Sequence, residues 1–413
     1  MSASNQTIYP PIVRRGVPIA LMMLYFVAAA IKSWSFIQDG RFWGEEGTIF
    51  YPNISSSSFI EGVLFVYNGH IELWTNLIIK IASIFGVEHA PRISVWLSIL
   101  AQSLPIALII KYRRTFSLSD FGVAAIIIIA AGLPQAPEVF SNTINLHFHF
   151  AIAVAIIASL DHKSLDNRLL NRGVLLASGL SGIPSNFLAP VFLYRAIRSR
   201  NKESYIQLAI ISCTSLFQLI TILFHAEEIA QRPYSFQIEQ WWFSILNQTT
   251  LSPMLGLDLG QMFFTIFKNA VSGNRSCILF SAFVSLPLLS LIYCALKSQN
   301  SACRWLMASA LLLLFLSMLT SLEGIGDVII LMGGGRYFYA PTLLFAVCFI
   351  SMYQRFGWQE YALLSMVLIT ATTSLPNNFS GPPWLESYHQ AVSQGQTQVP
   401  TWPQGWVLKL SKP

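Results

Sequence analysis

The chain has 413 residues, of which 54% are hydrophobic and only 11% are charged, and its mean hydropathy is +0.55. A soluble domain usually carries about a quarter of charged residues, so the composition excludes ordinary soluble classes and predicts one polytopic membrane domain over residues 1–413. The net charge of +6 does not indicate a nucleic-acid partner, because the basic residues are spread over short segments between apolar ones.

Apolar segments of about the length that crosses a bilayer recur along the whole chain. The fold class that we predict is an all-α polytopic membrane protein with about eleven transmembrane helices. Two of the segments are short and are separated by Gly-Ile-Pro-Ser-Asn, so we expect a broken pair of helices that meets inside the protein. The expected spans are 17–36, 93–112, 121–140, 147–160, 173–184, 185–198, 205–225, 276–296, 305–322, 338–355 and 359–376.

The distribution of lysine and arginine predicts the orientation of the chain. With the N-terminus inside, most basic residues fall in short inner connections, as the positive-inside rule expects. The larger polar regions then lie on the outer face: a first loop at 37–92, a second sizeable loop at 226–275 and a tail at 377–413. We therefore expect the working surface on the outer face.

The segment 71–87 is apolar enough to resemble a further span. If it crossed the membrane, Lys111, Arg113 and Arg114 would lie outside unless another segment were removed from the count. We therefore expect an amphipathic helix that lies at the outer interface, within the first loop.

Three acids occur close together at the start of the first loop, namely Asp39, Glu45 and Glu46. One interpretation is a solvated acidic turn. The other is a carboxylate at the membrane boundary that acts as a general base or as a ligand of a divalent cation, since partial burial there would tune its pKa. Neighbouring aromatic residues would hold this loop at the level of the lipid headgroups.

Four further groups of polar residues, taken in chain order, could bind a substrate, and each also has a structural interpretation. The first could bind a polar substrate or only orient the loop. The second could bind sugar hydroxyls or only cap a helix end. The third interrupts an apolar stretch and is typical of a cavity wall. The fourth could clamp a lipid phosphate or anchor a helix at the interface. They are His70 with Glu72; Glu138, Asn142, Asn145 and His147; Ser185 with Asn186; and Arg336 with Tyr337.

The order of these motifs resembles the GT-C class of membrane glycosyltransferases, which use polyprenyl-phosphate-linked sugars. The matching stretches are WGEEGTIFYPN, NGHIELWTNL, PEVFSNTINLHF, GLSGIPSN, GRYFYAP and PQGWVLKL, in that order. The resemblance implies inverting transfer of a sugar from a polyprenyl-phosphate donor to a glycan, lipid or protein acceptor. It also implies a multi-pass protein of the bacterial inner membrane, with its N-terminus in the cytoplasm and its active face in the periplasm. It implies a catalytic acid at Glu45 or Glu46. The class usually has an aspartate there, so which of the two acts stays open.

Two other functions are compatible with the sequence. A transporter or flippase of a lipid-linked or polar solute would explain the broken pair of segments, although the sequence has no evident internal repeat and most acids lie at the outer boundary rather than in mid-span. A scaffold in an envelope-assembly complex would need none of the acids for activity.

Overall fold

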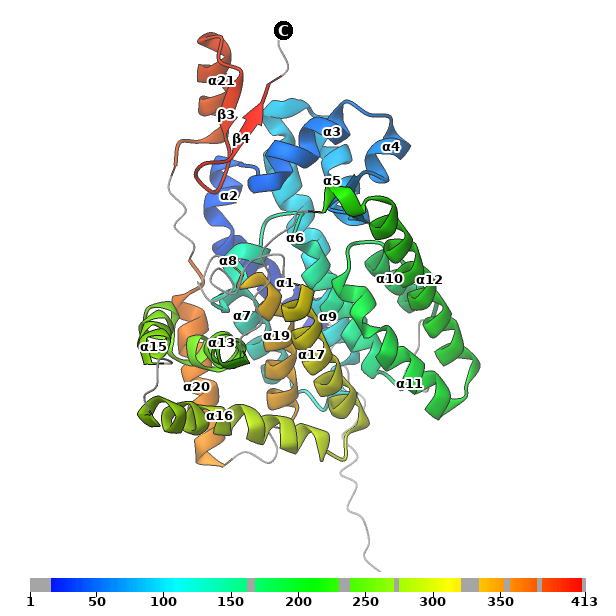
Figure 1. Cartoon of the computed structure of the whole chain (residues 1–413), viewed down its shortest axis with the longest axis vertical. Coiled ribbons are helices and arrows are strands. Elements are labelled where there is room, and N and C mark those ends of the chain that lie inside the picture. The colour runs from blue at the N-terminus through cyan, green and yellow to red at the C-terminus, as the bar shows by residue number, and fades with distance from the viewer. Residues whose placement is uncertain are drawn as a thin grey trace, which may run out of the picture.

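A computed structural model describes residues 16–161, 168–229, 238–270, 275–320, 334–352, 357–376 and 381–410, and most of them are helical (Figure 1). Among the described residues, three helices are long and apolar enough to cross a membrane: α6 (Gly86–Tyr112), α12 (Lys202–Phe224) and α17 (Ser301–Thr320). The prediction of a helical chain with membrane-crossing segments is confirmed to that extent, and the count of eleven spans stays a prediction.

Shorter apolar helices complete the bundle. They are α1 (Gly16–Lys32), α7 (Asp120–Gly132), α9 (Leu146–Ser159), α19 (Arg336–Ser351) and α20 (Trp358–Thr373). Helix α9 is buried along almost its whole length and packs against α6, α10 (Arg168–Gly179), α17 and α19, so it forms the centre of the core. Helix α16 (Arg275–Leu296), which was expected to be a span, runs across the lower end of the molecule in Figure 1, whereas α20 runs along it.

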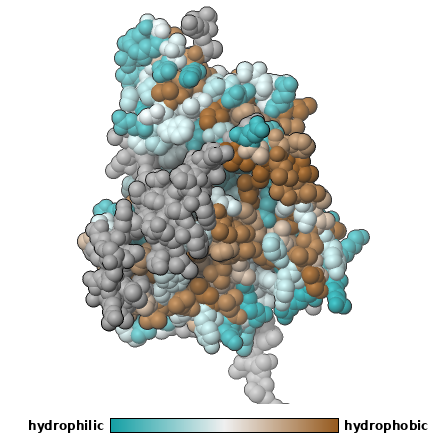
Figure 2. Space-filling view, viewed as in Figure 1, coloured by the Kyte–Doolittle hydropathy of each residue, from teal (hydrophilic) through white to brown (hydrophobic). Residues whose placement is uncertain are grey.

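The outer faces of the peripheral helices are apolar. On α1 the side chains of Ile19, Met23, Val27 and Ile31 follow one another at every fourth position, and each is exposed. Positions four apart share one helix face, and a soluble protein rarely exposes a continuous apolar stripe. Figure 2 shows apolar surface over the middle of the visible face and polar surface over its upper end. The arrangement suits contact with lipid.

The first loop folds into short helices above the bundle. They are α2 (Trp34–Asp39), a π-helical turn (Glu46–Phe50), α3 (Tyr51–Ser55), α4 (Phe59–Val63) and α5 (Leu73–Ser83). Helix α5 has eleven residues, which are too few to span a bilayer alone. It packs on α3, α4 and α6. Helix α6 begins at Gly86, earlier than the expected start at 93.

A small hairpin joins α4 to α5. Strand β1 (Val66–Tyr67) pairs antiparallel with β2 (His70–Ile71). The connecting Asn68 and Gly69 both have positive φ, +49° and +75°, as a two-residue hairpin turn of the primed type requires. A second antiparallel pair, β3 (Gln398–Pro400) and β4 (Val407–Lys409), follows α21 (Trp384–Ser393) in the tail. The chain is therefore mostly helical rather than strictly all-α.

The second sizeable loop is also helical where it is described. Its elements are η4 (Ala226–Glu228), α13 (Ile238–Leu246), a π-helical turn (Asn247–Leu251), α14 (Ser252–Leu255) and α15 (Leu257–Ala270). The rest of the expected loop 226–275, at 230–237 and 271–274, lies outside the described residues, as do 377–380 and 411–413 of the expected tail.

Prolines and glycines end two of the predicted spans early. Helix α7 stops at Gly132 because Pro134 and Pro137 follow, and a short helix, α8 (Ala136–Val139), takes up the rest of the segment 121–140. The expected broken pair is present as α10 (Arg168–Gly179), a 3₁₀ turn η3 (Pro184–Leu188) and α11 (Ala189–Ser199).

Candidate functional site

A cavity of about 260 Å³ lies where several helices end together. The N-termini of α9 and α19 and the C-termini of α12 and α17 meet there, below the first loop and beside η3; we call this the cavity end of the bundle. More than half of the predicted site residues line this cavity, although they come from distant parts of the sequence: Glu45, His70, Glu72, Asn145, His147, Arg336 and Tyr337. Aromatic side chains share the wall, among them Phe50, Tyr67 and Phe148.

Backbone contacts with the break between α10 and η3 hold the hairpin in place. The nitrogen of Gly182 donates to the carbonyl of Ile71 at 3.0 Å, and the nitrogen of Leu73 donates to the carbonyl of Leu180 at 3.1 Å. Gly182 has a φ of +96°, and a Cβ added to it would lie 2.9 Å from Cβ of His147. The break thus fixes both the hairpin and the start of α9.

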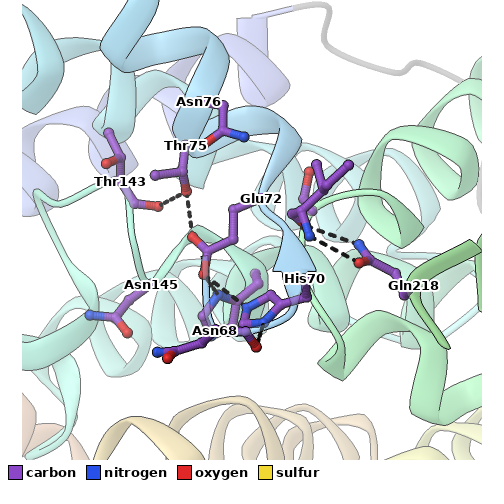
Figure 3. A network of polar contacts seen from close by, with 12 residues as sticks. Asn68, His70, Glu72, Thr75, Asn76, Thr143, Asn145 and Gln218 are labelled. Atoms are coloured by element: carbon purple, nitrogen blue, oxygen red, sulfur yellow. Dashed lines mark hydrogen bonds and ion pairs between the residues drawn. The ribbon is translucent and has the colours of Figure 1, made fainter. Parts of the chain in front are cut away.

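Gln218 on α12 clamps the same hairpin (Figure 3). Its Oε1 accepts from the nitrogen of Ile71 at 3.1 Å, and its Nε2 donates to the carbonyl of Ile71 at 2.9 Å. No sequence motif marks this residue, and it is not among the predicted site residues. The sequence does hold one signal, a polar stripe along an otherwise apolar helix, which the structure buries: Gln207, Thr214, Gln218 and Thr221.

Glu72 stands between two histidines at the cavity wall. Its Oε1 lies 3.3 Å from Nε2 of His70 and 3.7 Å from Nδ1 of His147, and its Oε2 accepts from Oγ1 of Thr75 at 2.8 Å. Burial alone would raise the pKa of Glu72, but the hydrogen bonds and the two histidines outweigh it and lower the pKa. Glu72 is therefore held as a carboxylate.

His70 is held in its charged form by the same contacts. Burial lowers the pKa of His70, but the hydrogen bond and charge of Glu72, together with the carbonyl of Asn68, more than reverse the effect and raise it. The Nδ1 atom lies 3.1 Å from the carbonyl oxygen of Asn68. Because both ring nitrogens face acceptors, the imidazolium with two N–H groups satisfies the site best.

A polar network continues from Glu72 to the acid motif. Oγ1 of Thr75 also lies 2.7 Å from the carbonyl oxygen of Thr143. The backbone nitrogen of Thr143 and its Oγ1, the latter at 2.7 Å, both donate to Oε1 of Glu46. Oε2 of Glu46 accepts from the nitrogen of Trp43 at 2.8 Å. Glu46 therefore ties the first loop to the segment before α9.

The two adjacent glutamates have different surroundings. Glu46 is fully buried and is not part of the cavity wall. Burial raises its pKa to about 7, against the hydrogen bonds from Thr143 and Trp43, and the charge of Glu45 adds to the rise. Glu45 is half-buried and lines the cavity. Of the two candidates for a catalytic acid, Glu45 is the one that a bound molecule could reach.

Arg336 and Tyr337 begin α19 and also line the cavity. The guanidinium carbon of Arg336 lies 5.3 Å from the centre of the Tyr337 ring. Behind them the carboxylate of Glu138 accepts from the backbone nitrogens of Gly335 and Arg336, each at 3.3 Å. Glu138 therefore caps this helix N-terminus and lies outside the cavity wall, whereas the Arg336 side chain, like that of His70, brings a cationic group to the wall.

Other predicted residues have structural contacts around the cavity. Asn142 donates to the carbonyl of Glu138 at 2.8 Å, and Asn145, which also lines the cavity, donates to the same carbonyl at 2.7 Å. Asn186 donates to the carbonyl of Gly179 at 2.8 Å and accepts from Oγ1 of Thr214 at 2.9 Å. Ser185 is buried, and Asp39 is half-buried at the end of α2; neither lines the cavity.

The tail covers the acid motif, a contact that no sequence motif predicts. The nitrogen of Trp402 donates to the carbonyl of Phe42 at 2.9 Å, and the nitrogen of Gly44 donates to the carbonyl of Trp402. Oγ1 of Thr48 donates to the carbonyl of Val407 at 3.0 Å. The β3–β4 hairpin and the loop that carries Glu45 and Glu46 are thus one packed unit at the upper end of Figure 1.

A larger and more apolar cleft of about 390 Å³ lies between α16, α19 and α20, and it shares no lining residue with the cavity. Within the described ranges, no group of three or more histidine, cysteine or acidic side chains is arranged to hold a metal ion.

No protein-family model matches this chain, and comparison with curated proteins and with solved structures likewise gives no match.

Proposed function

We propose that the chain is a membrane glycosyltransferase that transfers one sugar from a polyprenyl-phosphate donor, with inversion, to a hydroxyl of a glycan, lipid or protein acceptor. The observation that carries the proposal is the meeting of Glu45, Glu72, His147 and Arg336 in one cavity at the end of apolar helices. Those groups match the two needs of the reaction, a proton acceptor and a cation for the departing phosphate. We place the cavity on the periplasmic face of the bacterial inner membrane.

Arg336 is the proposed phosphate clamp. Its fork of donors matches phosphate oxygens. Since Glu138 already satisfies the nearby backbone nitrogens of α19, the phosphate would bind the side chain rather than the helix terminus. The C1–O bond to the phosphate breaks as the acceptor oxygen attacks, and the positive charge stabilises the lipid phosphate that leaves.

The size and lining of the cavity support a single sugar unit as its guest. A volume of about 260 Å³ lies near the lower end for small-molecule sites, so a long oligosaccharide would not fit inside. Tyr67, Phe148 and Tyr337 offer apolar ring faces, while Asn68 and Asn145 offer amides for hydroxyl groups. The lipid part of the donor and the rest of the acceptor would lie outside the cavity.

The test is sugar transfer in membranes at matched expression, read as the masses of envelope glycans and of lipid-linked sugars. We expect Arg336→Ala to lower transfer by roughly 10²–10³-fold and to cause the lipid-linked donor to accumulate. Arg304→Ala is the matched control, since Arg304 lies at the start of α17, far along that helix from the cavity, and donates to the carbonyl of Ser298. Unchanged glycan and donor masses in Arg336→Ala and in Glu45→Gln would contradict the proposal and favour transport or a scaffold.

A further inference from the structure

His147 lines the cavity with a buried ring that lies next to a carboxylate. Its Nδ1 atom is buried and has no hydrogen-bond partner in the described part of the chain, and Oε1 of Glu72 lies 3.7 Å from it. The ring is wedged in place, because it packs on Phe148 with ring centres 4.3 Å apart and on the open side of Gly182. An added Cβ at Gly182 would lie 3.4 Å from this nitrogen.

The carboxylate of Glu72 selects one tautomer of His147. Glu72 is an acceptor, so the proton of a neutral His147 belongs on Nδ1, which faces it, and the lone pair then lies on Nε2. A carboxylate behind an imidazole fixes the tautomer and stabilises the imidazolium that forms when the ring takes up a proton. The other partners of Glu72, His70 and Thr75, keep it ionised and immobile.

We propose that His147, oriented by Glu72, is the proton acceptor for the acceptor hydroxyl. This inference rests on the proposed function. The hydroxyl oxygen forms the new bond to C1 of the sugar, its proton passes to Nε2 of His147, and the electrons of the broken C1–O bond leave with the lipid phosphate beside Arg336. His147 is then an imidazolium between the new product and the Glu72 carboxylate, and it returns the proton to water.

Glu45 is less suited to that task, although it lines the same cavity. Within the described residues no hydrogen bond or ion pair holds its carboxylate, whereas a general base works best when a third group orients it. We assign Glu45 to binding hydroxyl groups of the sugar or the acceptor, and Glu72 to positioning His147.

The decisive comparison is between His147→Gln and Glu45→Gln, assayed for turnover and for donor binding in the full-length protein. We expect His147→Gln to lower turnover by roughly 10²–10⁴-fold, with the dissociation constant of the donor changed by less than about threefold. Glu45→Gln should chiefly raise the KM for the acceptor. His149→Gln is the matched control, because His149 lies two residues along the same helix, is not part of the cavity wall and contacts the carbonyl of Val139.

Azide separates a proton-transfer role from a structural one. As an anion it can attack C1 and form a glycosyl azide without losing a proton. If His147 is the base, His147→Gln should consume the donor with azide as fast as wild type while it fails with the natural acceptor. Equal losses with both nucleophiles would overturn the proposal, because they would mean a damaged cavity.

The pH profile of turnover is a second test that does not need a folded His147 variant. Protonation of the base should give wild type an acidic limb, and Glu72→Gln should move it to lower pH, because it removes the negative charge that favours the imidazolium. If the acidic limb of the pH profile lies at the same pH in Glu72→Gln as in wild type, the proposal is contradicted. The other titratable or charged groups around His147 are Glu45, Tyr67, His70, His149, Arg336 and Tyr337.

The two proposals fail in different ways. If wild type transfers no sugar, the proposed function is wrong. If wild type transfers sugar and His147→Gln does so at the same rate while Glu45→Gln does not, only the assignment of the base is wrong, and Glu45 takes that role.

Discussion

At the scale of single residues, neighbouring side chains with the same chemistry have separate tasks. Glu46 accepts hydrogen bonds from Trp43 and Thr143 in the interior, while Glu45 faces the cavity. The sequence predicted an important pair of acids at this place but could not divide their roles, because successive residues of a helical turn point about 100° apart and the phase of the turn is set by tertiary contacts. The burial of Glu46 makes it a structural carboxyl group.

Glu46 should make the stability of the protein depend on pH. An acid whose pKa rises on folding, here from 4.5 to about 7, stabilises the fold while it is protonated. That contribution is present below about pH 4.5 and is lost as the pH rises towards 7, and a shift of this size is worth on the order of 3 kcal/mol. We expect the Tm of wild type in detergent to fall between pH 5 and pH 8 and the fall to be smaller in Glu46→Gln.

Glu45→Gln is the control for this prediction, since it removes the same charge one residue away. Glu45→Gln should keep most of the pH dependence of wild type, because burial, and not the charge of Glu45, is the main cause of the raised pKa of Glu46. A Glu46→Gln protein with the same dependence as wild type would show that another group titrates on folding.

At the scale of elements, apolar length predicted the helices well and the contacts between them poorly. The broken pair around η3 was predicted from its prolines and glycines, as was the division of the chain into many helices. Its contact with the β1–β2 hairpin could not be predicted, because the two segments are more than 100 residues apart and meet through backbone atoms that carry no sequence signature. The helices of the region 226–275 were missed because their polar residues were taken as those of a loop.

Gln218 joins α12 to the β1–β2 hairpin through two hydrogen bonds to the backbone of Ile71. Loss of this side chain should make the hairpin more mobile. Gln218→Met keeps most of the volume but leaves the nitrogen of Ile71 without its acceptor, which costs roughly 1–3 kcal/mol when such a donor is buried. We expect faster hydrogen exchange in residues 66–75 and weaker sugar transfer.

Gln207→Met is the matched control on the same helix. Gln207 is also fully buried, but it donates to Glu203 and has no contact with the hairpin. The Gln207→Met variant should show the same rate of hydrogen exchange in residues 66–75 as wild type. Equal exchange in both variants would mean that the contacts with Gly182 and Leu180 suffice to hold the hairpin.

At the scale of the whole molecule, the tail and the first loop form one unit above the bundle. Composition predicted the polar tail but not its position, because strands of three residues and a single short helix are too brief to indicate a partner. A chain that ends after Ser393 would lack the β3–β4 hairpin and with it the hydrogen bonds to Phe42, Gly44 and Thr48. We expect it to lose sugar transfer and to be cleaved by protease within residues 41–50.

A chain that ends after Leu410 is the control, because it keeps both strands of the hairpin. It should transfer sugar as the full chain does. Protection of residues 41–50 in the shorter chain would show that the acid motif is stable without its cover.

The contact between Thr48 and Val407 also sets an order of events during biosynthesis. The ribosome adds Val407 359 residues after Thr48, which takes roughly 20–70 s at the usual rate of translation. For that time the nascent first loop, with Phe42 and Trp43, has no hairpin to cover it, although its own helices have already left the insertion machinery. The polypeptide can therefore cover its acid motif only late in synthesis, and the interval is long enough for a chaperone to bind the uncovered aromatic residues.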